Sequence, residues 1–318
     1  MTTALAGGFF LPSGKFETKI MKEELKFSFE FFPSKNAEDE VAAWKSLKKL
    51  ESFDPQFYSV TFGAGGGERI KTDSFVKKIK KESNVPVAGH LTCVDMSKDE
   101  INDIALNWFE KGIKRIVALR GDVRNPGEQY KPHPDGYKNA ADMTAGLKKL
   151  ANFDISVAGY PEIHPDSKNK ELDLDNLKRK VDAGADRIIT QFFFDENIFL
   201  KFRDDIAKQG IKIQLLPGIM PIQNYKRVKN FSNKCGTSVP AWIEKEFEGS
   251  EDNPDVQKMI GSSIATDLVK KLQKEGVNEF HFYTLNKYEL SYAVCSRLKS
   301  YKNFLKTKKE KEKGEIRI

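Results

Sequence analysis

Residues 113–122 read Ile113-Lys-Arg-Ile-Val-Ala-Leu-Arg-Gly-Asp122, an apolar run that ends in a cation, a glycine and a carboxylate. A buried strand that ends in polar residues can present them at the mouth of a sheet or barrel. Alternate residues of a strand share a face, so Arg120 and Asp122 point the same way, and Gly121 lets a ligand approach the backbone. For one strand alone, an ion pair that closes the strand explains the pattern as well, so the other strand ends decide its meaning.

The rest of the chain alternates between short apolar runs and helical patterns. The predicted strands are residues 27–33, 57–62, 85–93, 113–122, 155–161, 187–194, 211–219 and 279–285. Helices are predicted at residues 38–52, 71–82, 138–150, 172–183, 223–234, 254–275 and 287–298, with two more after Ser97 and Asp195. The clearest helix begins with a capping box of Ser97 and Glu100 and ends at Gly112.

This order of strands and helices predicts an α/β fold with a parallel sheet. Eight strand–helix units in about 270 residues fit a single (β/α)8 TIM barrel, for which about 250 residues is typical. A doubly wound open sheet is the alternative, but it would usually carry a glycine-rich turn after the first strand, which here ends in Glu30-Phe-Phe-Pro33. We expect the barrel domain over residues 26–298, an N-terminal arm over residues 1–25 and a basic C-terminal tail over residues 299–318.

The net charge of +7 lies mostly at the C-terminal end. Residues 299–318 contain eight Lys or Arg and three Glu, a balance of +5. The nearly neutral remainder argues against nucleic-acid binding. The three cysteines, Cys93, Cys235 and Cys295, have no metal-binding spacing and indicate a reducing cytoplasm. No apolar run approaches the roughly 20 residues that span a bilayer, so no membrane attachment is expected.

Polar side chains stand at the predicted strand ends, where barrel enzymes build their active sites. They are Glu30, Thr61, His90, Arg120, Asp122, Tyr160, His164, Gln191, Tyr283 and Asn286. Because seven of the eight strand ends contribute, a shared functional mouth is favoured over separate structural ion pairs. A metal site is not expected, since the four histidines lie on separate elements and form no His-x-His pair.

Glu30 is the best candidate for a catalytic acid. Aromatic residues surround it in the sequence, and it is predicted to point into the barrel mouth. Burial there would disfavour the charged carboxylate and raise its pKa, which suits a proton donor. An ion pair between Glu30 and Arg120 is the structural alternative, and it would lower that pKa instead.

The basic run Asn176-Leu-Lys-Arg-Lys180 has two readings. It could be a solvated helix face or a phosphate clamp. Its position after the fifth strand, close to His164, raises the chance of the clamp.

Several motifs, in order along the chain, resemble those of the methylenetetrahydrofolate reductase family. They are Phe29-Glu-Phe-Phe-Pro33, Ser59-Val-Thr-Phe-Gly63, His90-Leu-Thr-Cys93, Ala118-Leu-Arg-Gly-Asp122, Tyr160-Pro-Glu-Ile-His164, Asn176-Leu-Lys-Arg-Lys-Val-Asp-Ala-Gly184, Thr190-Gln-Phe-Phe-Phe-Asp195 and Phe280-His-Phe-Tyr-Thr-Leu-Asn286. Each motif is weak alone, but the ordered set is specific. The resemblance implies the short bacterial form, without the regulatory domain of the eukaryotic enzymes.

The resemblance implies a cytoplasmic enzyme that reduces 5,10-methylenetetrahydrofolate to 5-methyltetrahydrofolate and so supplies methyl groups for methionine synthesis. NADH or NADPH would reduce a non-covalent FAD and leave before the folate binds, which is a ping-pong sequence. Glu30 would be the general acid that opens the folate ring. Asp122 would lie by the flavin and stabilise the resulting iminium cation. A homo-oligomer is also expected.

The resemblance also assigns binding residues. FAD would be bound by Thr61, Phe62, Ala64, His90, Arg120, Gly121, Asp122, Tyr137, Tyr160, His164, Asp173, Asn176, Arg179 and Lys180. Substrate would be bound by Glu30, Asp122, Gln191, Phe231 and Lys287, with Gln191 and Phe231 contacting folate and nicotinamide in turn.

One departure from the family pattern stands at position 287. The family usually has Arg there, and Lys287 keeps the charge but loses the two-pronged grip on a carboxylate. The competing hypothesis is a catalytically inactive barrel that acts as a binding protein. It predicts the loss of the polar strand ends, which are present.

Overall fold

The structure, a computed structural model, describes residues 24–315 except residues 35, 63–65 and 123–128. Eight parallel strands form a closed barrel in sequence order, as predicted. They are β1 (Lys26–Phe31), β2 (Phe57–Val60), β3 (Val87–Thr92), β4 (Arg115–Leu119), β5 (Asp154–Gly159), β6 (Arg187–Phe192), β7 (Gln214–Ile219) and β8 (Glu279–Tyr283). The barrel closes where β1 pairs with β8, with Ser28 opposite His281 and Glu30 opposite Tyr283.

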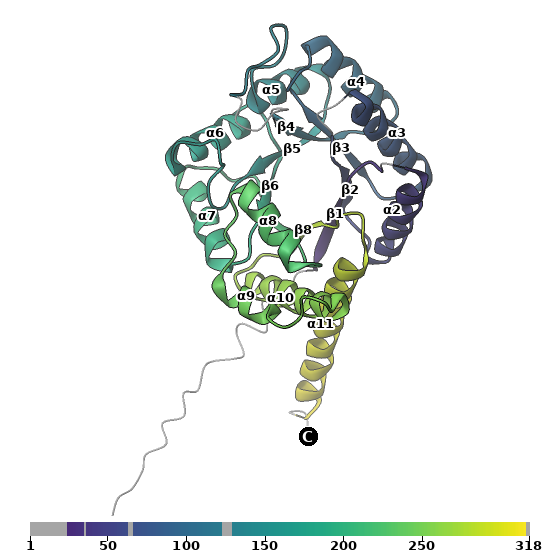
Figure 1. Cartoon of the computed structure of the whole chain (residues 1–318), viewed down its shortest axis with the longest axis vertical. Coiled ribbons are helices and arrows are strands. Elements are labelled where there is room, and N and C mark those ends of the chain that lie inside the picture. Colours follow the sequence, from purple (N-terminus) through teal and green to yellow (C-terminus); the bar gives the residue numbers. More distant parts are fainter. Residues whose placement is uncertain (1–23, 35, 63–65, 123–128, 316–318) are drawn as a thin grey trace, which may run out of the picture.

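The helices surround this barrel as an outer ring (Figure 1). They are α2 (Ala37–Leu50), α3 (Gly66–Glu82), α4 (Lys98–Glu110), α5 (Ala140–Leu150), α6 (Lys170–Asp182), α7 (Glu196–Lys208), α8 (Tyr225–Cys235), α9 (Ala241–Phe247), α10 (Pro254–Lys274) and α11 (Glu289–Glu315), with a short 3-10 turn η1 (Glu51–Phe53). The (β/α)8 barrel inferred from the alternating pattern is therefore confirmed, and the open-sheet alternative is excluded.

Side-chain caps explain why helices begin where they do. Ser97 and Glu100 form the predicted capping box at the start of α4, with the Glu100 carboxylate accepting from the Ser97 N–H at 2.8 Å. Asn139 and Asn169 are simple N-caps of α5 and α6, and each side chain accepts a backbone N–H of the first turn. These caps lie just beyond the loops that follow β3, β4 and β5, so they fix those loops at one end of the barrel.

Two apolar layers hold the barrel and its helices together. The outward residues of β1, including Phe27, Phe29 and Phe31, belong to the main core between strands and helices. A smaller cluster of Phe57, Ala88, Val117, Ile189 and Leu216 fills the barrel interior. This division places Ser28 and Glu30, which alternate with the outward phenylalanines, on the interior face of β1.

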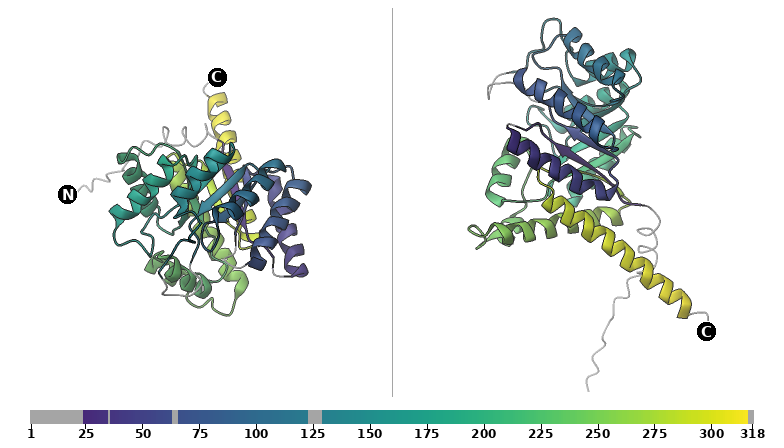
Figure 2. Two further views of the ribbon diagram at one scale, coloured as in Figure 1. Left: turned by 90° about the horizontal axis from the view of Figure 1, so that it is seen from above. Right: turned by 90° about the vertical axis from the view of Figure 1, so that its right-hand side faces the viewer.

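Several element boundaries differ from the sequence-based prediction. Strand β4 ends at Leu119, because Gly121 adopts a φ of 86° that a continuing strand does not allow. The segment 238–253, predicted only as an extra connection, contains α9. The last helix was expected to end at Leu298, but α11 continues to Glu315 and projects away from the barrel (Figure 2).

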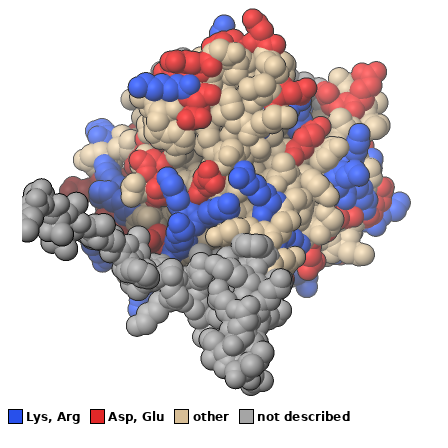
Figure 3. Space-filling view, turned by 90° about the horizontal axis from the view of Figure 1, so that it is seen from below, with Lys and Arg blue, Asp and Glu red and all other residues tan. Residues whose placement is uncertain are grey.

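Charged side chains of both signs are intermixed on the face shown in Figure 3. This mixture is consistent with the small net charge of the chain outside its C-terminal end. Among the described residues, no helix is long and apolar enough to cross a membrane.

Candidate active site

A cavity of about 270 Å³ opens at the carboxyl ends of the strands. It gathers polar side chains that the sequence placed on six different strand ends, namely Glu30, Thr61, His90, Tyr160, Gln191 and Tyr283. Apolar side chains complete the wall, among them Phe62, Leu119, Phe192, Met220 and Phe231. We call this space the central cavity. The prediction that separate strand ends converge on one mouth is confirmed by this lining.

A second cavity of about 610 Å³ continues from the first over the carboxyl ends of β3, β4 and β5. We call it the lateral cavity. The two share Phe62, Leu119, Ala158 and Tyr160, so they form one elongated depression. The lateral cavity is lined by the predicted residues Arg120, Gly121, Asp122, His164, Asn176, Arg179 and Lys180.

Glu30 lies between two histidines at the floor of the central cavity. Its Oε2 atom is 3.4 Å from Nε2 of His90 and 3.5 Å from Nε2 of His281, and its side chain is 18% exposed. Burial alone would raise the pKa of Glu30, but the hydrogen bond from His281 and the charges of both histidines lower it below its usual value. The predicted rise of this pKa is therefore wrong for the free protein.

His90 lies beside Glu30 in the wall of this cavity, with its Nε2 atom 3.4 Å from Glu30 Oε2. Its Nε2 atom is buried and lacks a hydrogen-bond partner among the described residues. Burial lowers the pKa of His90 to about 4, against the attraction of Glu30. At neutral pH His90 is thus an uncharged imidazole beside an ionised carboxylate.

Arg120 does not form the predicted alternative ion pair with Glu30. Its guanidinium donates to Asp166 Oδ2 at 2.7 Å and lies 5.0 Å from the ring centre of Tyr130. Because Arg120 extends along the lateral cavity, the ion-pair explanation of Glu30 is excluded in this structure.

Lys180 is buried at the edge of the lateral cavity, where its ammonium donates to the carbonyl of Ala158 at 2.5 Å. Burial lowers the pKa of Lys180 to about 8, and the charge of Arg120 adds to that effect. Arg179 and Asn176, from the same helix, line the cavity beside it. Asn176, Arg179 and Lys180 of the basic run therefore face the cavity, which favours the phosphate-clamp interpretation for these residues, while Lys178 pairs with Asp182 on the helix surface.

Asp173 shapes the loop that carries His164. Its carboxylate accepts from the His164 N–H at 3.1 Å and from the Ser167 hydroxyl at 3.3 Å. The ring of His164 packs edge-on against Tyr160, with centroids 4.5 Å apart. Asp173 thus positions His164 and Ser167, which line the lateral cavity.

The other predicted site residues take different positions. Phe231 stacks on Phe192 at 5.6 Å between ring centres and lines the central cavity. Tyr137 lines neither cavity, because its ring packs against Gly146 and its hydroxyl donates to Asn102 at 2.8 Å. Lys287 is exposed beyond Leu285, which lines the cavity rim. Ala64 lies outside the described residues.

Sequence reasoning missed the hydrogen bonds that hold Glu30 in place from β8. Thr284 donates to the Glu30 carbonyl at 2.6 Å, and the Asn286 amide bonds both the N–H and the carbonyl of Phe32 at 2.9 Å. Asn286 has a φ of 58°, which an asparagine tolerates better than most residues. The Asn286 side chain, expected at the mouth, therefore hydrogen-bonds the segment after β8 to the segment after β1. A polar residue in a loop after a strand was the only signal for it.

The hydrogen bond between Tyr283 and Thr190 was not predicted from the sequence either. The Tyr283 hydroxyl donates to the Thr190 carbonyl at 2.7 Å, which fixes the ring against the central cavity. Gly218 makes room for it, since a Cβ there would lie 2.6 Å from the Tyr283 ring. Among the described residues, no group of three or more potential ligands could hold a metal ion.

Comparisons with known proteins agree with this architecture. The family model described as methylenetetrahydrofolate reductase matches residues 15–299. The chain is 48% identical over 275 residues to the 5,10-methylenetetrahydrofolate reductase of Escherichia coli, covering 86% of this chain and 91% of that protein. It is 47% identical over 278 residues to the protein of the same name from Pectobacterium carotovorum, covering 87% and 91%.

A plant protein and a solved structure are more distantly similar to this chain. The chain is 35% identical over 283 residues to methylenetetrahydrofolate reductase (NADH) 1 of Arabidopsis thaliana, covering 86% of this chain but 48% of that protein. Among solved structures, a Clostridium thermocellum protein that binds two copies of 5-methyl-5,6,7,8-tetrahydrofolic acid matches with a TM-score of 0.58 at 13% identity, covering 91% of this chain and 99% of that one. At that identity, the likeness shows a shared barrel fold.

Proposed function

The chain belongs to the methylenetetrahydrofolate reductase family, and we propose that it reduces 5,10-methylenetetrahydrofolate to 5-methyltetrahydrofolate with electrons from NADH or NADPH. The observation that carries this proposal is the position of Glu30 at the floor of a cavity that continues into a second, cation-lined cavity. Such a pair of spaces suits a cofactor in one and a reacting ring in the other.

The lateral cavity fits FAD by the chemistry of its lining. Lys180, Arg179 and Arg120 supply cations for the phosphates, and Asn176 and His164 supply polar groups beside them. The Thr92 hydroxyl is buried on this wall without a hydrogen-bond partner among the described residues, so a ligand could satisfy it. Bound there, FAD would supply two-electron chemistry by accepting a hydride from the nicotinamide and passing it to the folate.

The central cavity is the proposed site of the reacting ring systems. Gln191 and Phe231 stand on its wall, and Phe231 is 45% exposed, so its ring is open to a ligand. We propose that nicotinamide and folate occupy this same space in turn, which is a ping-pong sequence. Lys287, exposed beyond the rim residue Leu285, would contact the carboxylate tail of the folate.

Glu30 would donate a proton to a folate ring nitrogen, so that the methylene carbon becomes an electrophilic iminium. In the free protein its carboxyl is ionised at neutral pH because its pKa is lowered. A ligand that covers the mouth removes water from Glu30 and so favours its neutral form. Asp122, exposed on the lateral cavity wall, would stabilise the cation.

The proposal is tested with the purified protein under anaerobic conditions. NADH should bleach the visible absorbance of bound flavin, and 5,10-methylenetetrahydrofolate added afterwards should restore it with formation of 5-methyltetrahydrofolate. A protein that binds no flavin, or whose reduced flavin is not reoxidised by the folate, would contradict the proposal. We propose that the product, 5-methyltetrahydrofolate, supplies methyl groups for methionine synthesis.

A further inference from the structure

His281 occupies an unusual place in the barrel interior, directly beneath Glu30. It is fully buried and stacks on Phe57 with ring centres 5.7 Å apart. Branched aliphatic side chains dominate the interior of most barrels, and a buried polar ring costs free energy unless it is bonded. Here the ring is bonded, because Nδ1 lies 2.7 Å from the Ser28 hydroxyl.

The two ring nitrogens of His281 face different groups. Nδ1 contacts Ser28, while Nε2 lies 3.5 Å from both Glu30 Oε2 and the Ser59 hydroxyl. The three groups Ser28, His281 and Glu30 therefore form a continuous polar path along the barrel interior. Catalytic hydrogen bonds are often long in a ligand-free enzyme and tighten once a ligand is bound.

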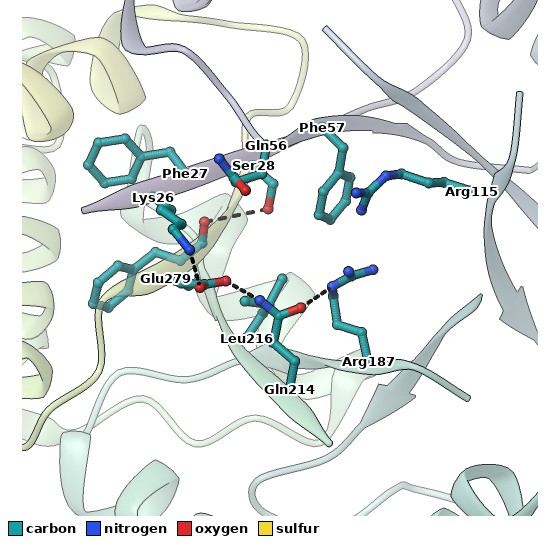
Figure 4. A pocket seen from close by; sticks show the side chains of 11 residues that line it. Lys26, Phe27, Ser28, Gln56, Phe57, Arg115, Arg187, Gln214, Leu216 and Glu279 are labelled. Carbon is teal, nitrogen blue, oxygen red and sulfur yellow. Dashed lines mark hydrogen bonds and ion pairs between the residues drawn. The ribbon is translucent and has the colours of Figure 1, made fainter. Parts of the chain in front are cut away.

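The lower end of this path reaches a second opening of the barrel. Ser28 lines a small polar cavity of about 30 Å³ at the amino ends of the strands (Figure 4). Its wall includes the first residues of six strands, Lys26, Phe57, Arg115, Arg187, Gln214 and Glu279. The Lys26 and Glu279 side chains are 45% and 28% exposed, so this cavity lies at the solvent boundary opposite the mouth.

We propose that Ser28 and His281 form a proton relay that delivers a proton to Glu30 from the lower cavity. This proposal rests on the proposed function of Glu30 as the acid. The relay explains why hydroxyl and imidazole groups are buried between the lower cavity and the catalytic carboxylate.

The proton transfer balances without a change of any heavy-atom bond. Water in the lower cavity gives a proton to Ser28 Oγ, the Ser28 proton moves to Nδ1 of His281, and the Nε2 proton moves to Glu30. One proton enters from solvent, and one appears on the carboxylate. After Glu30 has passed its proton to the folate, a half-turn of the imidazole returns the N–H to the Glu30 side.

The need for such a path follows from the state of Glu30 in the free protein. Its carboxyl is ionised there because its pKa is lowered, and ligands that cover the mouth would remove water from it and so favour its neutral form. At that stage the direct route from solvent is covered as well. A path through the barrel supplies the proton while the ligands stay bound.

Charged and titratable groups surround the relay on both sides. Above it lie Glu30, His90 and Tyr283, whose ring is 5.5 Å from that of His281. Below it, Arg115 and Arg187 lie 5.3 and 5.4 Å from the Phe57 ring centre. Asp154 pairs with both arginines, and Lys26 pairs with Glu279.

The test replaces Ser28, which removes the lower step but leaves His281 and Glu30 in place. In stopped-flow experiments on the FAD-loaded protein, Ser28→Ala should slow the folate half-reaction by about tenfold, a part of the roughly 10²–10⁴-fold that general acid catalysis contributes. The solvent deuterium isotope effect on this half-reaction should rise, because proton delivery becomes rate-limiting. Reduction by NADH should not change, and Ser28→Thr should restore the wild-type values.

Ser156→Ala is the matched control. Ser156 is also a buried strand serine, but its hydroxyl accepts from Arg187 at 3.1 Å and does not face Glu30. It should leave the isotope effect unchanged. As a second variant, His281→Gln keeps a donor toward Glu30 but cannot pass a proton on, and it should slow the folate half-reaction selectively.

The relay is wrong if Ser28→Ala keeps the wild-type folate rate and isotope effect, or if both half-reactions slow alike. Failure of the proposed function looks different, since the wild-type protein would then show no flavin reoxidation by the folate. A selective loss in Glu30→Gln with wild-type behaviour in both Ser28→Ala and His281→Gln would keep Glu30 as the acid and overturn only the relay.

Discussion

Arg120 and Asp166 form an ion pair, with 2.7 Å between Nη2 and Oδ2, and this pair directs the guanidinium along the lateral cavity and away from Glu30. Asp166 is 60% exposed on its side chain, so solvent screens the pair and its contribution to stability is small. The Arg120 guanidinium can therefore change partner at little cost. An anionic cofactor in the lateral cavity would compete with Asp166 for it.

Asp166→Asn should tighten FAD binding, because it frees the Arg120 guanidinium for the phosphates. An exposed ion pair contributes about 0–1 kcal/mol, so the dissociation constant should fall by at most about fivefold. Titration of the apoprotein with FAD, followed by flavin fluorescence, measures this change. The control is Asp182→Asn, which breaks the surface pair with Lys178. Weaker FAD binding in Asp166→Asn would instead show that Asp166 orients Arg120 for the cofactor.

Lys180 should make FAD binding depend on pH. Its pKa is lowered to about 8, so it is charged below that pH and neutral above it. A neutral amine attracts phosphate less, and FAD affinity should therefore fall as the pH rises from about 7 to about 9. Equilibrium titration at several pH values measures the slope.

Two variants of α6 decide whether Lys180 causes that slope. Lys180→Met should bind FAD weakly at every pH and remove most of the slope. Lys178→Met should retain it, because Lys178 pairs with Asp182 on the helix surface. An unchanged slope in Lys180→Met would assign the pH dependence to another group.

Lys287→Arg should strengthen folate binding. A guanidinium can grip a carboxylate with two parallel hydrogen bonds, whereas an ammonium acts as a point charge. Because position 287 is exposed, we expect the KM for the folate to fall by only about two- to fivefold. The rate of flavin reduction by NADH is the internal control. An equal change in both half-reactions would remove Lys287 from the folate tail site.

The fold was predictable because each strand–helix unit carries its own signal. The capping box of Ser97 and Glu100 and the alternating phenylalanines of the first strand depend only on neighbours in sequence. Barrel closure then brings the carboxyl ends of all strands to one face, which is why polar residues at strand ends predicted a shared mouth there. The cavity lining follows from topology once the order of the elements is known.

The electrostatics of Glu30 could not be predicted in the same way. His281 is separated from Glu30 by almost the whole chain and reaches it only because β8 pairs with β1. Strand alternation tells which residues face inward, but it does not tell which inward residues meet across a barrel. For the same reason, the hydrogen bonds between Asn286 and Phe32 and the ion pair between Arg120 and Asp166 were not predicted. Tyr137, assigned by resemblance alone, lines neither cavity, and its contact with FAD stays a prediction.

Glu30→Gln should separate the two half-reactions. Reduction of the flavin by NADH needs no acid, so the variant should still bleach at the wild-type rate. Reduction of 5,10-methylenetetrahydrofolate needs a proton on a ring nitrogen, which a glutamine of similar size cannot supply. We expect the folate half-reaction to slow by at least about 10²–10⁴-fold, the usual contribution of general acid catalysis. Stopped-flow absorbance on the FAD-loaded variant measures each step separately.

The structure sharpens this test, because the Glu30 carboxylate contacts two histidines and not Arg120. Loss of a negative charge beside neutral His90 should leave FAD binding intact, whereas loss of an Arg120 partner would have weakened it. Glu162→Gln is the matched control, since the Glu162 carboxylate accepts from the Ser238 N–H at 2.8 Å and lines neither cavity. It should leave both half-reactions unchanged. Equal slowing of both half-reactions in Glu30→Gln would assign Glu30 a structural role and leave the reaction without its proton donor.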